Sequence, residues 1–562
     1  MSNSATGAYW PEHLARRFVL PETTLARNLE ISALRYPEMP AIHFFGSTLT
    51  YKDFLEQVNA LAGWLQQKAG LGRGERVLLF MQNAPQWLIA YYAVLRADAV
   101  AVPVNPMNRA AELDHFIRDS GASVAFCTQE LVQHLLDAPS AGELRQVVTS
   151  AYSDYLPEAP VFKLPDWLRE PLRAVDGTTA WREALAAGHA PRAPEAGPDD
   201  LCALHYTSGS TGLAKGCMHT HRTFMHTAMG ISFWHRHVPG TVFLGVSPMY
   251  QIAGLLNNVN CSVYSAATVV PMPRWDRDLA VQLIDRYRVN WAGLAPTAVI
   301  DLLSKPDLDR YDLTSLRRVS AGGAPMPQEV WRRMHDTLGL PFIEAYGMTE
   351  AAGTTHINPI ERPKPQCLGV AFFDTESFAI DLETGRPLGP NAQGELVMRG
   401  PQFFKGYWNL PEATREAFIE IDGKQYYRSG DIGYVDEEGY FFMTDRLKRM
   451  INASGFKVWP AQVETRLYEH EAIREACVVS SPDRYRGETV KALVVLQPEQ
   501  VGSVTEQQII DWAKARLPAY KYPRQVEFID ALPKAPTGKI LWRELQDREN
   551  ARASEKRGDQ QT

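Results

Sequence analysis

The sequence lacks the features that mark several classes of protein. Its six cysteines contain no Cys-x-x-Cys pair, which argues against a zinc site or a disulfide framework and favours reduced thiols. No stretch approaches about 18 uninterrupted apolar residues, and the N-terminus, MSNSATGAYWPEHLARR, has no basic-then-apolar signal pattern. The 58 basic and 65 acidic residues leave a net charge of only -7, so nothing indicates nucleic acid or an anionic membrane as a partner. We therefore expect a soluble, cytoplasmic protein without an integral membrane segment, and a homodimer stays open.

Apolar periodicity indicates an α/β fold over much of the chain. Amphipathic runs alternate with short apolar runs from Pro21 to about Thr128 and again from Leu201 to Gly347. Repeated strand, loop and helix predict a largely parallel sheet. Residues 138–198, in contrast, are rich in Ala, Pro and Asp without clear periodicity. Irregular structure is expected there.

The character of the chain changes near residue 394. Glycine-punctuated, hairpin-like segments follow over 394–444, which favours antiparallel strands. A region of about 115 residues follows Arg446, a common size for one domain, and it ends in a polar tail at 550–562 that is expected to be frayed. The predicted fold class is α/β, with a large N-terminal domain, 1–446, of parallel-rich α/β sheets plus a small β-barrel-like part. A small mobile α+β C-terminal domain is expected over 447–562.

One short glycine-rich segment, YTSGSTGLAKG from Tyr206 to Gly216, directly follows the apolar run LCALHY. Glycines permit a tight concave path whose backbone N–H groups and hydroxyls can face an anion, and a lysine adds charge. It is not a Walker A loop, because Ala214 precedes Lys215 and no Ser or Thr follows it. It does not fit the Gly-x-Ser-x-Gly nucleophile motif either. By itself the segment also fits a flexible surface loop.

Three distant segments decide between these interpretations. They are EAYGMTE at Glu344–Glu350, the glycine-turned stretch Tyr427–Pro460, and PKAPTGKILWREL at Pro533–Leu545. Together with the glycine-rich segment, in this order, they resemble the adenylate-forming superfamily of acyl-CoA synthetases, firefly-type luciferases and peptide-synthetase adenylation domains. The resemblance runs from about Pro21 to Leu545 and is strongest to AMP-forming acyl-CoA synthetases.

The resemblance implies a two-step reaction that uses ATP, Mg²⁺ and CoA. A carboxylate and ATP give acyl-AMP and pyrophosphate, and a thiol then displaces AMP. Lys539 would bridge the attacking carboxylate and the α-phosphate, Thr349 would hydrogen-bond the α-phosphate, and Glu350 would hold magnesium with Thr211. Each half-reaction moves negative charge, so positioned cations and donors are needed.

The resemblance also implies the nucleotide contacts. The glycine-rich segment would wrap the β- and γ-phosphates, Tyr346 would stack on adenine, and Asp431 would accept both ribose hydroxyls with support from Arg446. The expected ATP and AMP residues are Thr207, Ser208, Gly209, Ser210, Thr211, Gly212, Lys215, Gly323, Ala324, Pro325, Glu344, Ala345, Tyr346, Gly347, Met348, Asp431, Met443, Arg446 and Lys457.

A hinge and a CoA site follow from the same resemblance. Lys448 lies where the family rotates its small domain between an adenylating and a thioester-forming pose. The rotation would withdraw Lys539 and bring the Gly455–Lys457 loop toward CoA. The expected CoA residues are Gly455, Phe456, Arg484 and Arg486, although solvated surface charge explains the two arginines at least as well.

The acyl pocket is where the sequence departs from the family pattern. Its expected residues are Trp234, Tyr250, Gln251, Gly254, Leu255 and Gly322. Many relatives carry Phe-His in place of Tyr250-Gln251, and some long-chain enzymes carry a gating Trp near Leu255. Two polar wall residues would suit a short or medium acid, branched or hydroxylated, such as a 2-hydroxyisobutyrate-like acid, because a buried amide or phenol needs a polar partner. Equally, both are ordinary wall residues or bond each other.

Several alternatives stay open from sequence. The substrate could be a medium- or long-chain fatty acid, the acceptor could be a carrier protein, and a silent nucleotide-binding regulator is the non-enzymatic alternative, which the intact motif residues speak against. Five histidines cluster in HTHRTFMHTAMGISFWHRH, but no metal-binding spacing is present, so we expect structural or pocket-wall roles on a helix and assign no metal to them. They are His219, His221, His226, His235 and His237.

Overall fold

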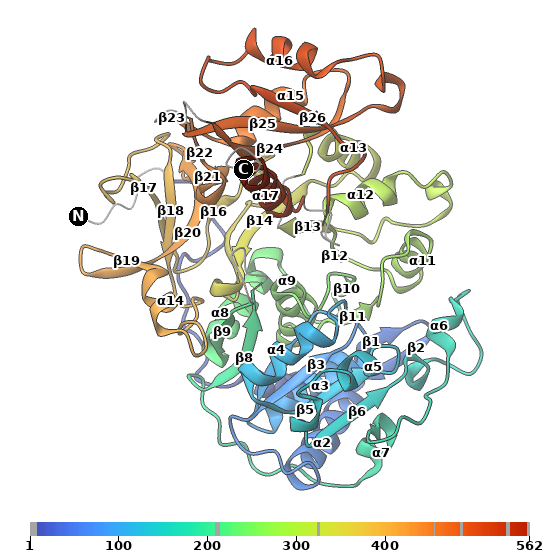
Figure 1. Cartoon of the computed structure of the whole chain (residues 1–562). Coiled ribbons are helices and arrows are strands. Elements are labelled where there is room, and N and C mark those ends of the chain that lie inside the picture. Colours follow the sequence, from blue (N-terminus) through green and yellow to red (C-terminus); the bar gives the residue numbers. More distant parts are fainter. Residues whose placement is uncertain are drawn as a thin grey trace. The chain divides into compact units, whose positions relative to one another are not determined.

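A computed structural model describes residues 8–207, 214–322, 326–453, 456–483, 487–534 and 540–558 (Figure 1). These residues form two compact units. The large unit consists of Tyr9–Glu376 and Arg399–Phe418, and the small unit consists of Ala8, Ser377–Met398 and the chain from Ile419 onward. The predicted boundary after residue 446 falls within the small unit, and that domain assignment stays a prediction.

The first sheet of the large unit is mostly parallel. Its strands follow the order β16-β15-β14-β13-β12-β10-β11-β1-β2, with antiparallel pairs at both edges and parallel pairs from β14 to β1. The bounds are β1 Pro40–Phe44, β2 Ser47–Thr50, β10 Val242–Gly245, β11 Thr268–Pro271, β12 Trp291–Gly293, β13 Arg318–Gly322, β14 Phe342–Met348, β15 Gly353–Ile357 and β16 Gly369–Ala371. The intervening helices include α11 Arg277–Tyr287, α12 Pro296–Leu303 and α13 Gln328–Leu338. The predicted alternation of short apolar strands with helices is confirmed.

The second sheet of the large unit is parallel except at one edge. Its order is β7-β6-β5-β3-β4-β8-β9, and the β8–β9 pair is antiparallel. The bounds are β3 Arg76–Phe80, β4 Val100–Pro103, β5 Ala122–Thr128, β6 Gln146–Ser150, β7 Thr179–Ala180, β8 Leu201–Tyr206 and β9 Gly216–Thr220. Helices α4 Ala110–Ser120, α5 Val132–Leu136 and α7 Trp181–Ala186 pack near this sheet, whereas α6 Asp166–Arg169 packs through Leu168 into the cluster of Phe44 and Leu244 of the first sheet.

The core of the large unit lies between its two sheets. One buried cluster joins residues of β1, β10 and β11 to residues of β3, β5 and β8, with α1 Leu25–Arg35, α2 Tyr51–Gln67 and α3 Pro85–Arg96 among them. In α3 every residue from Pro85 to Leu95 is buried. A helix that is apolar on all faces is expected only inside a protein, and α3 is therefore the central helix of this core.

The small unit contains two antiparallel-rich sheets. The first has the order β17-β18-β20-β21, with β19 beside β20, and the second has β23-β22-β25-β24, with β26 parallel to β25. The bounds are β17 Glu376–Ile380, β18 Gly394–Arg399, β19 Phe418–Ile421, β20 Lys424–Val435, β21 Tyr440–Arg446, β22 Ile451–Ala453, β23 Phe456–Val458, β24 Ile473–Asp483, β25 Gly487–Leu496 and β26 Gln525–Phe528. Helices α15 Pro460–Leu467, α16 Glu506–Lys514 and α17 Trp542–Gly558 complete it. The predicted antiparallel strands and small α+β region are confirmed.

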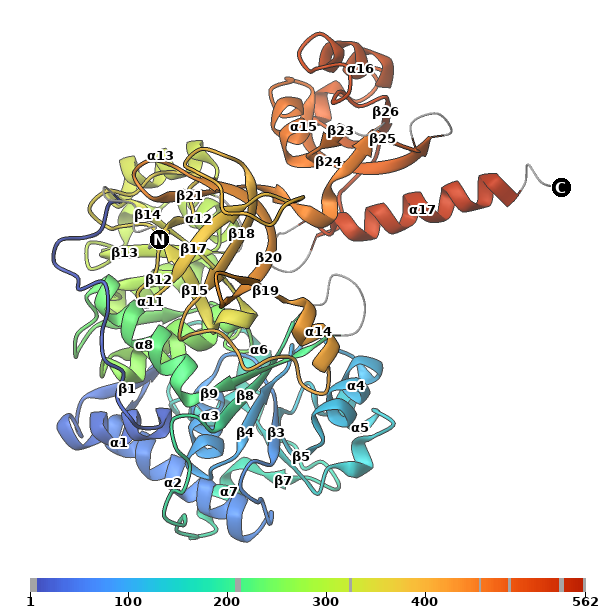
Figure 2. The same cartoon turned by 90° about the vertical axis from the view of Figure 1, so that its left-hand side faces the viewer.

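Two expectations about irregular structure were wrong. Residues 138–198 contribute β6 and β7 to the second sheet, because Val147 and Val148 are buried there. The described part of the tail is not frayed, since 550–558 continue helix α17 (Figure 2). This helix is held by Glu549, whose carboxylate accepts hydrogen bonds from Lys491 Nζ (2.6 Å) and Ser481 Oγ (2.7 Å). Polar composition alone therefore does not predict disorder, because a polar helix can dock through one buried ion pair.

The histidine cluster also differs from its expected place. His219 lies on strand β9, and the helix that follows, α8, begins at His221 and ends at His235. All four of His219, His221, His226 and His235 are buried.

No helix among the described residues is long and apolar enough to cross a membrane.

Candidate active site

The flanks of the glycine-rich segment form the neck of a β-hairpin. Tyr206 at the end of β8 pairs with Gly216 at the start of β9, and Thr207 N donates to Lys215 O at 2.9 Å. The predicted residues Ser208, Gly209, Ser210, Thr211 and Gly212 lie outside the described residues. A strand follows the loop here, whereas a helix follows a Walker A loop. This order of elements gives a second reason to exclude the P-loop class.

Side chains from distant segments fix this neck. Tyr206 Oη donates to Asp119 Oδ2 at 2.6 Å, and Trp408 N donates to Gly216 O at 2.7 Å. Trp408 Nε1 donates to the backbone oxygen of Asp119 at 2.8 Å. A Cβ atom on Gly216 would approach Tyr206 Cζ to 3.1 Å, so the Tyr206 ring would have to shift by a few tenths of an ångström to admit a side chain there. The two flanks of the segment are thus fixed by contacts with residues distant in sequence.

Lys215 and Glu350, the predicted phosphate and magnesium residues, both contact one tyrosine. Tyr407 Oη donates to Glu350 Oε1 at 2.7 Å, and Lys215 Nζ lies 5.1 Å from the centroid of the Tyr407 ring. Lys215 and Glu350 are half-buried, while Tyr407 is 9% exposed. The structure therefore brings together a cation and a carboxylate that are distant in sequence.

Thr349 is held by a buried histidine. It begins the short 3-10 turn Thr349–Ala351 after β14, and His219 Nε2 lies 2.7 Å from its backbone oxygen. Burial lowers the pKa of His219 to about 4, so the imidazole is neutral at pH 7. A neutral imidazole facing a carbonyl oxygen must present its N–H there, which fixes the proton on Nε2.

Glu344 has a structural task within the predicted nucleotide site. Its Oε1 accepts from Met326 N at 3.0 Å, and its Oε2 accepts from Cys367 N at 3.4 Å. Burial raises the pKa of this carboxyl above its ordinary value, against the effect of the backbone donors. Glu344 thus clamps the chain just after Gly323, Ala324 and Pro325, three predicted adenine contacts that lie outside the described residues.

The remaining residues of the EAYGMTE motif lie along β14. Tyr346 is buried, with its ring 5.7 Å from that of His356, and Ala345 and Met348 are half-buried. Gly347 is exposed, and a Cβ atom there would lie 1.7 Å from Gly353 O. Gly322, on the neighbouring strand, faces a similar limit, because its Cβ would lie 2.4 Å from Ala345 O.

Glu350 fits a magnesium ligand. Mg²⁺ in nucleotide sites is bound through one or two carboxylates together with phosphate oxygens. An ionised carboxylate has about four acceptor positions, and Tyr407 uses one of them on Oε1. The remaining oxygen can therefore bind a cation while Tyr407 holds the group in place.

The segment Ser247–Leu255, which carries most of the predicted acyl-pocket residues, is held by two buried asparagines. Asn83 Nδ2 donates to Ser247 O at 3.0 Å, and Asn83 Oδ1 accepts from Met249 N at 2.8 Å. Asn258 Nδ2 also donates to Ser247 O, at 2.8 Å. Because each side chain bonds the backbone, the path of this segment is set independently of any substrate.

The predicted acyl-pocket side chains have partners of their own. Gln251 Nε2 donates to Tyr250 Oη at 3.4 Å, and Trp234 Nε1 donates to Asn358 O at 3.0 Å. Leu255 is fully buried and begins the π-helical turn Leu255–Cys261. A Cβ on Gly254 would lie 1.9 Å from Pro248 O, so the turn is tightly closed. Single π-turns in helices are frequent at functional sites.

In the small unit, the predicted ribose residues are paired. Arg446 Nε lies 3.0 Å from Asp431 Oδ1 across the β20–β21 pair, and Asp431 is 4% exposed. Met443 is exposed on β21, and Lys448 is exposed in the 3-10 turn Leu447–Arg449. The backbone of Phe456 and Lys457 forms part of β23. Lys539, Gly455, Arg484 and Arg486 lie outside the described residues.

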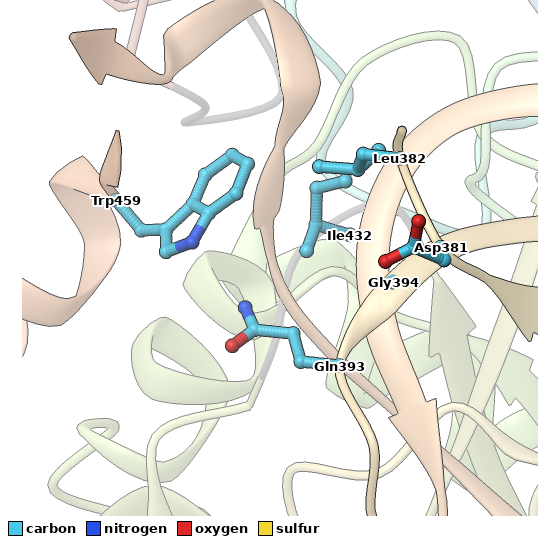
Figure 3. A pocket seen from close by; sticks show the side chains of 6 residues that line it. All are labelled: Asp381, Leu382, Gln393, Gly394, Ile432 and Trp459. Atoms are coloured by element: carbon cyan, nitrogen blue, oxygen red, sulfur yellow. The ribbon is translucent and has the colours of Figure 1, made fainter. Parts of the chain in front are cut away.

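A cavity of about 190 Å³ lies in the small unit, and one of its lining residues, Ile432, follows Asp431 directly in sequence (Figure 3). Asp381 and Leu382 line it from the turn after β17, Gln393 and Gly394 line it at β18, and Ile432 and Trp459 complete it. It contains none of the predicted site residues, and Gln393 Nε2 donates to Thr444 Oγ1 at 2.6 Å. We assign no ligand to it.

Sequence reasoning missed three residues that hold the site. Tyr407, His219 and Asn83 contact Glu350, Thr349 and the Ser247–Met249 backbone respectively. Tyr407 follows Gly406 in FFKGYW, and this glycine with two aromatic neighbours is the one local signal of a constrained position. His219 stands out in the sequence only as part of the histidine cluster, and nothing in its local pattern indicates a contact with Thr349.

Comparison with known proteins identifies the family. The family "AMP-binding enzyme" matches residues 29–408, and "AMP-binding enzyme C-terminal domain" matches residues 462–539. The chain is 35% identical over 553 residues to a long-chain-fatty-acid–CoA ligase of Bacillus subtilis, covering 96% of this chain and 97% of that protein. It is 34% identical over 519 residues to a feruloyl-CoA synthase of an Amycolatopsis species, covering 91% and 96%.

A solved structure supports the same family assignment. ATP-bound MatB from Rhodopseudomonas palustris superposes with a TM-score of 0.82 at 25% identity, covering 95% of this chain and all of that one. The family resemblance and the α/β fold class expected from sequence are thereby confirmed, and the silent regulator is not supported. The chain belongs to the AMP-binding enzyme family and is an AMP-forming acyl-CoA synthetase.

Proposed function

We propose that the acid activated by this enzyme is a medium- or long-chain fatty acid. The observation that carries the proposal is the similarity, over 96% of the chain, to a protein named long-chain-fatty-acid–CoA ligase. The hydrogen bond between Gln251 and Tyr250 supports it, because a polar pair that satisfies itself does not require a hydroxyl on the substrate. The short hydroxylated acid was expected because Tyr250 and Gln251 would need a polar partner on the substrate, and their mutual hydrogen bond removes this need.

An aromatic acid is the second candidate. It is favoured by the similarity to feruloyl-CoA synthase, which extends over 91% of the chain. A phenolic acid would make use of polar wall groups such as Tyr250, whereas a fatty acyl chain would not. The fatty-acid proposal predicts a higher kcat/KM for a fatty acid, and the aromatic-acid alternative predicts a higher kcat/KM for a phenolic acid such as ferulate.

The described residues support a division of tasks in the first half-reaction. Lys215 would bind the β- and γ-phosphates, Thr349 the α-phosphate, and Glu350 the magnesium ion, which when bound neutralises phosphate charge. The carboxylate oxygen attacks the α-phosphorus, the bond to the β-phosphate oxygen breaks, and pyrophosphate leaves. Asp431 would accept the ribose hydroxyls, and its ion pair with Arg446 would hold its carboxylate in place.

In the second half-reaction, Lys539 would withdraw and CoA would reach the acyl-AMP. The thiol sulfur bonds to the acyl carbon, the acyl–phosphate bond breaks, and AMP leaves with the charge, while the thiol proton passes to solvent. Lys457, Phe456 and Gly455 would approach CoA after rotation about Lys448, with Arg484 and Arg486 as candidate phosphate contacts.

Pyrophosphate release across a panel of acids tests the substrate. The panel contains octanoate, palmitate, 2-hydroxyisobutyrate and ferulate, each with and without CoA. We expect kcat/KM to be highest for a fatty acid, at least about tenfold above 2-hydroxyisobutyrate, since each buried methylene contributes about 0.8 kcal/mol. A higher value for 2-hydroxyisobutyrate or ferulate would overturn the fatty-acid proposal.

The role of Lys539 has a separate test. Replacing Lys539 by Ala removes the charge proposed to bridge the carboxylate and the α-phosphate, so acyl-AMP formation should fall by about 10² or more. Thioester formation from supplied acyl-AMP and CoA should be retained, because the proposed hinge withdraws Lys539 in that step. Equal losses in both half-reactions would contradict the assignment, and Lys534→Ala, in the same segment, is the matched control.

A further inference from the structure

Tyr407 occupies an unusual position between two opposite charges. Its hydroxyl donates to Glu350 Oε1 at 2.7 Å, while its ring faces Lys215, whose Nζ lies 5.1 Å from the ring centroid. Within the described ranges no ion pair joins Lys215 to Glu350. Lys215 and Glu350, both among the described residues, thus share a contact with one phenol and form no ion pair with each other.

The backbone at Tyr407 is fixed by neighbouring strands. Lys405 N donates to Met218 O at 2.9 Å, and Met218 N donates to Gly406 O at 3.0 Å, so this segment pairs with β9. Phe404 N donates to the backbone oxygen of Glu350 at 2.8 Å. Lys215, just before β9, and Glu350 are therefore tied to the same segment that carries Tyr407.

A further hydrogen bond and a glycine turn orient the residue itself. Tyr407 N donates to Thr414 Oγ1 at 2.9 Å, and Thr414 belongs to α14, Pro411–Glu416. Gly406 has a φ of +139°, and a Cβ atom there would lie 2.7 Å from Thr414 Cγ2. Because only glycine adopts this backbone without strain, the turn before Tyr407 is specified by the sequence.

The charge arrangement has a physical consequence. A lysine and a glutamate within reach attract each other, and a ligand that needs both must first break their contact. A tyrosine can satisfy each without neutralising either, because its O–H donates to a carboxylate and its ring face attracts an ammonium group. Lys215 is then left for phosphate, and the second oxygen of Glu350 is left for a cation.

We propose that Tyr407 is a positioning residue that separates Lys215 from Glu350 and aligns the Glu350 carboxylate for Mg²⁺. This inference rests on the proposed roles of Lys215 and Glu350. Tyr407 touches neither substrate nor metal in this scheme, and it acts through the two residues beside it.

Substitution by Phe isolates the hydroxyl. Tyr407→Phe keeps the ring that faces Lys215 and removes the donor to Glu350. At saturating ATP and acid, the free Mg²⁺ concentration for half-maximal pyrophosphate release should rise about tenfold, since loss of a group that orients a metal ligand costs about 10- to 100-fold in metal affinity. Tyr407→Leu removes the ring face as well, so the KM for ATP should also rise, whereas in Tyr407→Phe it should stay within about twofold.

A matched control lies in the same neck. Tyr206→Phe removes a tyrosine hydroxyl that donates to a different carboxylate, that of Asp119. The Mg²⁺ dependence of this variant should equal that of the wild type, whatever happens to kcat. A similar shift in Tyr206→Phe would indicate general loosening of the neck and would overturn the inference.

A binding measurement separates this inference from the function on which it rests. The affinity of Mn²⁺ for the protein with a non-hydrolysable ATP analogue, followed by electron paramagnetic resonance, should fall about tenfold in both Tyr407→Phe and Glu350→Gln. If Glu350→Gln binds Mn²⁺ like the wild type, the metal role of Glu350 fails. If Glu350→Gln is weakened and Tyr407→Phe is not, the role of Tyr407 alone fails.

Discussion

At the residue scale, the atoms assigned to chemistry are held by buried neighbours. Glu344, whose predicted nucleotide contact stays a prediction, accepts hydrogen bonds from two backbone N–H groups with its carboxylate. His219, expected to be a structural histidine, presents Nε2 to Thr349 O. Buried polar groups must be hydrogen-bonded, so each one in such a site constrains a neighbour.

His219 leads to a prediction about pH. Its pKa is lowered by burial from 6.5 to about 4, so above pH 6.5 it is neutral in both folded and unfolded chains. Between pH 6.5 and 4 only the unfolded chain takes up the proton, and this histidine makes the free energy of unfolding fall by about 1.4 kcal/mol per pH unit. His219→Gln keeps a donor for Thr349 O but cannot titrate, so its free energy of unfolding should decline less steeply on acidification.

Urea unfolding at pH 7.5 and pH 5.0 measures this difference. His219→Phe should show the same shallower pH dependence as His219→Gln. It should also be less stable by about 1 to 3 kcal/mol at both pH values, because the Thr349 oxygen loses its donor. Identical pH dependence in the wild type and both variants would contradict the lowered pKa of His219.

At the element scale, strand β14 shows why its motif needs glycine. The β14–β15 pairing shifts register between Tyr346 and Gly347, at the point where β14 approaches the backbone of Gly353. The sequence motif predicts the glycine, and the strand pairing explains it. Gly347 is required because two backbones meet there, and its φ is not in the left-handed region.

Gly347→Ala should therefore be severely destabilising. A Cβ atom 1.7 Å from Gly353 O forces the strands apart, so we expect a loss above about 4 kcal/mol or failure to fold. The control is Gly339→Ala at the end of α13, where φ is +67° and no atom lies within 4 Å of the added Cβ. Only backbone strain of about 1 to 2 kcal/mol applies there. Thermal unfolding of the two variants checks the contrast, and equal melting temperatures would rule out the steric explanation.

At the scale of the whole molecule, the predicted nucleotide residues are divided between the two units. Lys215, Thr349 and Glu350 belong to the large unit, whereas Asp431 and Arg446 belong to the small one. Within the small unit, one hydrogen bond spans the predicted hinge, because Asp445 Oδ2 accepts from Ala461 N at 2.7 Å. Arg449 and Glu464, which both follow the hinge in sequence, are paired with each other. Rotation about Lys448 would therefore have to break the contact between Asp445 and Ala461.

Lys448→Pro tests this hinge. Proline fixes φ and removes an N–H, so it should restrict rotation about this residue. Acyl-AMP formation should stay within about threefold of the wild type, while thioester formation falls by about tenfold or more, if rotation is needed only for the second step. Lys448→Ala, which keeps backbone freedom, should retain both activities. Full thioester formation in Lys448→Pro would refute the hinge assignment.

The family and most strands could be predicted from sequence because the motifs and the apolar runs that indicate them are contiguous segments of the chain. Strands β3, β5, β8 and β14 correspond to short apolar runs, so the signal that predicts each strand comes from consecutive residues. The four motifs occur in order, and each is a contiguous segment. The sequence by itself therefore determined the α/β class, the family and the motif residues assigned to ATP.

Only the tertiary structure decided which side chains hold those residues. Tyr407 is 57 residues from Glu350 in sequence, and their hydrogen bond exists because the Phe404–Trp408 segment pairs with β9. Helix α17 likewise packs through buried Leu545 and through the ion pair of Glu549 with Lys491 of β25. Contacts between distant segments leave no periodic trace in either segment, since each residue type is compatible with many partners. For that reason the sequence indicates the reacting groups, and the fold determines how they are oriented.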